Sequence, residues 1–153
     1  MLVSMSVDIK APPEVVWPYL VEPEKCMQWF TALKKFEWTS EQQGGVGSTF
    51  YWYEEASGRK FNLWFETTEW VENEVFGYSM TKGDFKSYDE RWEIDATADG
   101  CRFTFNDHIE FHYGPIGKII GYFAARGARD TGAEILAILK RLAEADAEKN
   151  HNC

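Results

Sequence analysis

The chain has 153 residues, enough for one domain with a full-sized core, and 44% of them are apolar. Its formal net charge of −9 argues against nucleic-acid binding, because no face concentrates enough lysine and arginine to gain from counterion release at a phosphate backbone. With 7 Trp, 7 Tyr and 11 Phe, it carries more ring surface than tight packing requires.

The termini and the cysteines favour a cytoplasmic protein. Residues 1–5 lack the basic and apolar regions of a secretory signal. Cys26, Cys101 and Cys153 are odd in number and far apart, which is typical of reduced thiols. We expect a single domain over residues 1–149 and a frayed polar tail over residues 150–153.

The first part of the chain predicts a strand and two short helices. Residues 2–9 are rich in Val, Ile and Met and alternate weakly, which indicates a strand. Pro13 and Glu14 then begin a helix, since proline is preset for the first turn and an acid stabilises that end. Pro18 should kink this helix. A second short helix begins at Pro23 and runs to Phe30.

Between the second helix and Tyr113, all signals are those of strands and turns. Strands are predicted at residues 34–39, 47–55, 60–71, 75–81, 86–96 and 101–112. The short turns between them favour an antiparallel meander. The last strand alternates clearly, with one side formed by Phe103, Phe105, Ile109 and Phe111. Consecutive aromatic residues at 50–53 leave the inward face of that strand open, and 60–71 is little clearer.

A long helix over residues 115–149 ends the chain, because Pro115 opens it and no proline follows. At 100° per residue an apolar stripe runs along it, with charged residues largely opposite. The stripe consists of Ile116, Ile120, Ala124, Gly127, Ala128, Thr131, Ile135, Ile138, Leu139 and Leu142. The side chains in the middle of this stripe are small, so either another backbone packs closely against them or a space is left there.

These elements predict an α+β architecture. A strongly twisted, seven-stranded antiparallel sheet can curve around the long C-terminal helix and bury one face of each. The two short helices lie between strands 1 and 2.

The order of elements and several local patterns resemble the START-like superfamily, also called SRPBCC, whose members have the helix-grip fold. The matching segments are Val7 to Trp17, Pro23 to Trp29, and Gly114-Pro115-Ile116-Gly117 opening a long helix that ends in Leu136 to Leu142. The likeness spans essentially the whole chain and is strongest to the bacterial polyketide cyclase/dehydrase-type branch. It implies an apolar cavity between sheet and helix, which would explain the small middle of the stripe.

Two acids occupy positions that the alternation assigns to the apolar, inward side, and they are the candidate catalytic residues. Asp107 falls in phase with Phe105 and Ile109, and Glu90 in phase with Tyr88 and Trp92. A carboxyl on an inward face is costly without a partner, and burial raises its pKa. The pair could orient a polar group of a ligand or move a proton. Alternatively, both acids lie hydrated near the open end, or pair with a base such as Arg91 or Arg126.

The run His108 to His112 does not predict a metal site. In a strand the two histidines stand about 13 Å apart, too far to bind one ion, so we expect no metal and no cofactor. Glu110 lies on the same polar side as both histidines.

We expect the protein to sequester a small hydrophobic molecule, lipid-, polyketide- or aromatic-like, in an internal cavity. The expected ligand-binding residues are Trp52, Phe65, Tyr88, Glu90, Trp92, Phe105, Asp107, Ile109, Phe123, Gly127 and Thr131. One alternative is a cyclase or dehydratase acting on a polyketide-like substrate through the same acids. Another is a protein-interaction module with a filled cavity.

Stable membrane insertion is not expected, because charged residues interrupt the long helix at Lys118, Arg126, Arg129 and Asp130. The sequence does not identify the ligand or the oligomeric state.

Overall fold

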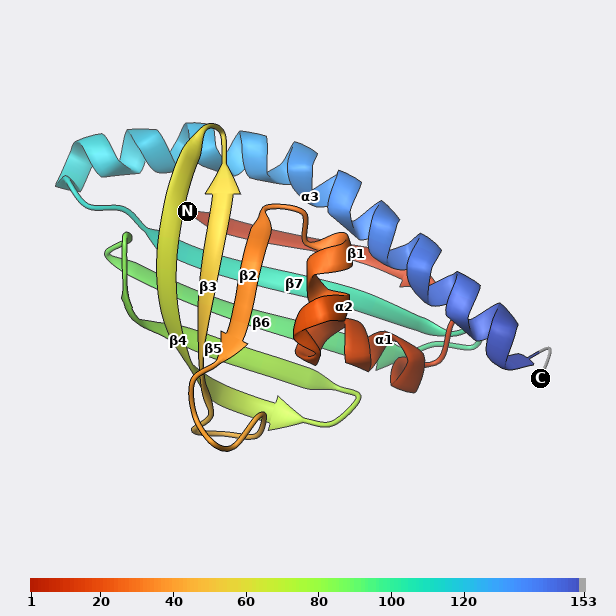
Figure 1. Ribbon diagram of the computed structural model, residues 1–153. Coiled ribbons are helices and arrows are strands. Elements are labelled where there is room, and N and C mark those ends of the chain that lie inside the picture. Colours follow the sequence, from red (N-terminus) through yellow and green to blue (C-terminus); the bar gives the residue numbers. More distant parts are fainter. Residues whose placement is uncertain (152–153) are drawn as a thin grey trace.

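The computed structural model describes residues 1–151, which form one antiparallel sheet and three helices (Figure 1). The strands are β1 (Leu2–Ile9), β2 (Leu33–Trp38), β3 (Thr49–Ala56), β4 (Arg59–Val71), β5 (Val75–Gly83), β6 (Ser87–Ala96) and β7 (Cys101–Glu110). The helices are α1 (Pro13–Val21), α2 (Pro23–Trp29) and α3 (Gly114–His151).

The strand order is β1-β7-β6-β5-β4-β3-β2, so the meander is continuous and β1 closes one edge beside β7. The sheet is strongly curved, and α3 runs along its β1 side, with α1 and α2 beneath the C-terminal half of α3 (Figure 1). The predicted helix-grip arrangement is confirmed, with element bounds that differ by only a few residues.

The core is dominated by aromatic rings from the concave face of the sheet. On β3, Phe50 and Trp52 are buried while Tyr51 and Tyr53 lie on the other face, which settles the register that the aromatic run left open. Leu63 and Phe65 are the inward residues of β4. These rings contact two rings at the end of α2: Trp29 packs against Trp92 and Phe103, and Phe30, which follows the helix, packs against Trp52.

The first half of the predicted stripe on α3 is wrong. Ile116 and Ile120 are exposed, and the buried face of α3 instead follows Gly117, Gly121, Gly132, Ile135, Leu136, Leu139 and Ala143. The buried face of the helix is rotated by about 100° from the predicted one, which corresponds to a shift of one residue along the sequence. The physical reason is close approach: Gly117 lies against the His112 carbonyl, and Gly132 against Met5 and Phe105.

The described cysteines, Cys26 and Cys101, are buried and free. Of the expected tail, residues 150 and 151 continue α3, while residues 152–153 lie outside the described residues, as does Cys153. None of the helices within residues 1–151 combines the length and apolar character that a membrane crossing requires.

Candidate functional site

The two inward acids that the sequence singled out are neighbours in the sheet. Glu90 on β6 and Asp107 on β7 stand directly opposite each other in the antiparallel register. Glu90 is only 5% exposed, and Asp107 is partly covered. The prediction that both carboxyls turn toward the concave side is confirmed by this burial and by their mutual contact.

Glu90 is held by three donors that surround it. The hydroxyl of Tyr78 donates to its Oε2, as does that of Tyr88 at 3.2 Å. The indole of Trp92 donates to its Oε1 at 2.5 Å. A buried acceptor that is saturated in this way favours the ionised form of the carboxyl.

Asp107 is the member of the pair that keeps its proton. Burial raises its pKa well above the usual range, and the adjacent Glu90 charge raises it further. Burial also raises the pKa of Glu90, but hydrogen bonds from Asp107 and from the ring donors oppose this effect. Asp107 therefore holds its proton more tightly than Glu90 does.

A third buried carboxyl, Glu54 on β3, joins this group. It is 8% exposed, and burial together with the Glu90 charge raises its pKa to about 8. Burial raises the pKa of the Cys26 thiol on α2, and the nearby charges of Glu90 and Glu54 raise it further. Cys26 is therefore a neutral thiol and not an activated nucleophile.

Sequence reasoning missed Glu54, although a signal for it exists. Glu54 is in phase with Phe50 and Trp52, but the aromatic run before it hides which face of the strand is inward. Once that face is known, alternation places Glu54 inside.

Glu54, Glu90 and Asp107 form a group that we call the acid cluster, and no base of the described residues neutralises it. Within residues 1–151, none of its carboxyls forms an ion pair with Lys, Arg or His. Arg91, a suggested partner, lies on the opposite face and binds Glu69 and Glu93. The pairing alternative considered from the sequence is therefore wrong for Arg91.

Three polar atoms near this cluster are buried without a hydrogen-bond partner. They are Oε1 of Glu54, Oδ1 of Asp107 and Nε1 of Trp52. Trp52 and Glu54 are two residues apart on β3 and share its inward face. Buried polar atoms are normally paired, so this position offers an unfilled donor and unfilled acceptors to a guest group.

The predicted wall residues separate into two sets. Six lie buried on the concave face of the sheet: Trp52, Phe65, Tyr88, Trp92, Phe105 and Ile109. Among these, Trp52 contacts the rings of Phe65 and Trp92, with centroids 5.1 and 6.0 Å away, so the deepest part is filled by protein. The other three, Phe123, Gly127 and Thr131, are exposed on α3.

Space is left beside Gly127. A Cβ placed there would have no atom of another segment within 4 Å. At 100° per residue, Gly127 lies on the same side of α3 as Ile138, which packs against the core. It lies roughly opposite Lys140, which donates to the Asp8 carbonyl of β1. Gly127 therefore lies on the side of α3 that faces away from β1.

A separate surface pocket of about 610 Å³ lies where β7 leads into α3. Among its lining residues are Lys86, His108, Glu110, His112 and Lys118. The two histidines thus belong to an outer surface, away from the acid cluster. Residues 1–151 contain no group of three or more His, Cys, Asp or Glu arranged to hold a metal ion.

Comparison with known proteins places the chain among domains of this architecture. Residues 2–144 match the family model described as polyketide cyclase / dehydrase and lipid transport. No curated protein has a sequence that matches the chain.

Solved structures share the fold at low sequence identity. A protein of Thermus thermophilus, TTHA0849, superposes with a TM-score of 0.80 at 20% identity, covering 96% of this chain and 99% of that one. The Zhui aromatase/cyclase of Streptomyces sp. R1128 gives 0.73 at 14% identity, with 94% and 93% covered. A START superfamily protein of Mycobacterium smegmatis gives 0.65 at 18% identity, with 97% of each chain covered.

Proposed function

Because this chain belongs to the polyketide cyclase / dehydrase and lipid transport family, we propose that it binds a small hydrophobic molecule between α3 and the concave face of the sheet. The observation that carries the proposal is the open space beside Gly127, on the side of α3 that faces away from β1. The apolar body of the guest would lie along α3, against the faces of Phe123, Gly127 and Thr131.

The acid cluster supplies the polar contacts of this site and limits the chemistry of the guest. Trp52 Nε1 needs an acceptor, and the unpaired oxygens of Glu54 and Asp107 suit a donor. A hydroxyl or amide satisfies both needs. A carboxylate guest would bring another negative charge into a buried site without a base, which is strongly unfavourable. The ligand class is therefore an apolar molecule with a neutral polar end.

Filling the open space tests the site. Gly127→Leu should abolish uptake of the neutral fluorophore N-phenylnaphthylamine without unfolding the protein, because the side chain would occupy the space that the probe needs. In the wild type, dodecanol should displace the probe and dodecanoate should not. Fluorescence titration measures both.

The matched control is Ala137→Leu, which adds the same side chain at an exposed position farther along α3. It should leave uptake unchanged. Uptake that survives Gly127→Leu, or that is absent from the wild type, would contradict the proposed site.

A second candidate function is cyclisation or dehydration of a polyketide-like substrate, favoured by the protonated Asp107 beside the Glu90 carboxylate. Asp107 could give its proton to a substrate oxygen, and Glu90 could take a proton from an adjacent carbon. An acid and a base held side by side is the arrangement that general acid–base catalysis requires.

Asp107→Asn separates the two functions, because the amide keeps the shape and loses the transferable proton. For an enzyme, conversion of a linear poly-β-ketone should fall at least about 100-fold while probe affinity changes little. For a binding protein, the wild type converts nothing and the substitution changes affinity. Product absorbance and probe titration, made on the same preparations, give the two readouts.

A further inference from the structure

The first three turns of α3 and the residue before them expose an unusual amount of apolar surface. Nine large hydrophobic residues of the described chain are exposed, and six of them lie between residues 113 and 123. They are Tyr113, Ile116, Ile119, Ile120, Tyr122 and Phe123, with exposed fractions from 39% to 79%. Scattered apolar residues on a surface need no explanation, but a contiguous group does.

This composition changes along the same helix. Beyond Phe123, the described part of α3 exposes no large hydrophobic side chain. Its outward positions there are instead Asp130, Ala133, Glu134, Ala137 and Arg141. The second half therefore has the polar outer face of an ordinary surface helix, and only the first half departs from it.

The apolar segment is accompanied by positive charge. Residues 113–129 contain Lys118, Arg126 and Arg129 and no acid, in a chain whose net charge is −9. Within the described residues, none of the three forms an ion pair. At 100° per residue, these three cations share one side of α3, an arc of about 160° around the helix axis, with four apolar residues. The apolar residues are Ile116, Ile119, Tyr122 and Phe123. We call these seven residues the α3 patch.

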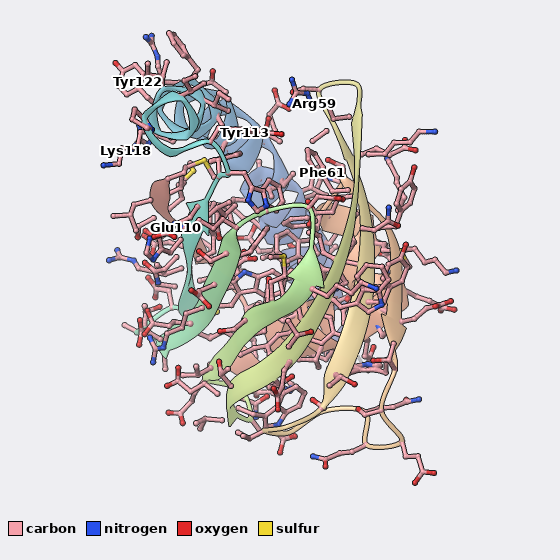
Figure 2. All side chains as sticks on the ribbon, turned by 90° about the vertical axis from the view of Figure 1, so that its left-hand side faces the viewer. Arg59, Phe61, Glu110, Tyr113, Lys118 and Tyr122 are labelled. Carbon is pink, nitrogen blue, oxygen red and sulfur yellow. The ribbon has the colours of Figure 1, made fainter. Side chains whose placement is uncertain are left out.

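The α3 patch lies at one end of the molecule, beside the open side of the sheet. Figure 2 shows Lys118 and Tyr122 on the outer side of α3, with Tyr113 turned toward the β3–β4 hairpin. Arg59 and Phe61 lie across the gap on that hairpin (Figure 2). A surface that covered the α3 patch would therefore adjoin the proposed binding site.

We propose that the α3 patch docks the protein onto the surface of an anionic lipid bilayer. A helix with apolar side chains flanked by Lys and Arg suits the boundary between headgroups and acyl chains, where rings and aliphatic groups enter and cations meet lipid phosphates. The chain lies on such a membrane and does not cross it.

The charges favour a bilayer over a second copy of the chain. A two-fold dimer through the α3 patch would bring the cations of both copies into one interface, where the patch supplies no acid to pair with them. An anionic surface attracts the same cations. The acidic remainder of the molecule also favours one orientation, with the α3 patch toward the lipid and the bulk of the protein away from it.

Flotation with vesicles tests the docking directly. The wild type should float with phosphatidylcholine vesicles that contain about one-fifth phosphatidylserine, and raising the salt about tenfold should release it. Arg126→Glu should weaken binding at least about fivefold, since each cation near an anionic surface contributes about that factor. Ile119→Ser should weaken it about tenfold, because its side chain no longer leaves water.

Arg141→Glu is the matched control, with the same charge reversal at an exposed position of α3 outside the α3 patch. It should bind within about twofold of the wild type, and circular dichroism should show all variants folded. Equal binding to pure phosphatidylcholine, or none to anionic vesicles, would overturn the proposal. So would a dimer in sedimentation velocity that Ile119→Ser dissociates. None of these readouts requires uptake of a hydrophobic ligand, so the docking and the proposed function can fail separately.

Discussion

Three carboxyls, those of Glu54, Glu90 and Asp107, lie in an aromatic core where no cation of residues 1–151 pairs with them. Each is accommodated differently: Glu90 by ring donors, Asp107 by keeping its proton, and Glu54 by a pKa raised to about 8. Burying these groups costs free energy that packing alone does not require. Their retention in the core is easier to understand if they serve a ligand or a proton transfer.

The acid cluster should make stability depend on pH. With its pKa raised to about 8, folded Glu54 holds a proton that the unfolded chain releases above about pH 5. The free energy of unfolding should therefore fall as the pH rises from about 5 to about 8, with Glu54 contributing up to about 1.4 kcal/mol per pH unit. Glu54→Gln should flatten this decline, as measured by urea denaturation at several pH values.

The same change at Glu66, an exposed position of β4, is the control and should leave the decline as in the wild type. A decline that is equally steep in Glu54→Gln would show that Glu54 does not hold its proton in the folded state.

At the scale of elements, the glycines of α3 have two different roles. Gly117 lets the helix approach the His112 carbonyl, where any side chain would collide with backbone. A side chain added at Gly127 would meet no atom of another segment within 4 Å of its Cβ. In a helix interior a glycine costs about 1 kcal/mol relative to alanine. Close contact with the His112 carbonyl explains why Gly117 is a glycine. No contact explains Gly127, so its glycine serves to leave space or has a function.

Alanine at these two positions should have opposite effects. Gly117→Ala should destabilise the protein by about 1–3 kcal/mol, because the backbone of the β7–α3 connection would have to move. Gly127→Ala should stabilise it by up to about 1 kcal/mol, since it gains helix propensity without a clash. Chemical denaturation of both variants measures the difference. Equal changes would mean that the helix does not rest on the sheet as described.

At the scale of the molecule, the curved sheet and α3 meet along only one side. α3 packs on β1 and β7 and, in its second half, on α1 and α2, whose rings fill that part of the interior. Its first half carries the α3 patch, and the open space beside Gly127 follows directly after it. Binding of an apolar guest and docking on a bilayer would therefore occur at the same end.

The sequence alone was sufficient for the architecture. Proline, glycine and acid positions mark where elements begin and end, and alternation in β6 and β7 places Glu90 and Asp107 on the inward face. These signals are local: they act through backbone torsions and through the two-residue period of a strand, which do not depend on distant parts of the chain.

Three features were decided only by the tertiary structure. The facing of α3 depends on how closely its glycines approach the β7–α3 connection and β1, which outweighs the burial of Ile116 and Ile120. The inclusion of Glu54 depends on which face of an all-aromatic run meets α2. The space beside Gly127 depends on where neighbouring side chains end. Each of these is a contact between segments far apart in the chain, and helix or strand periodicity carries no information about such distances.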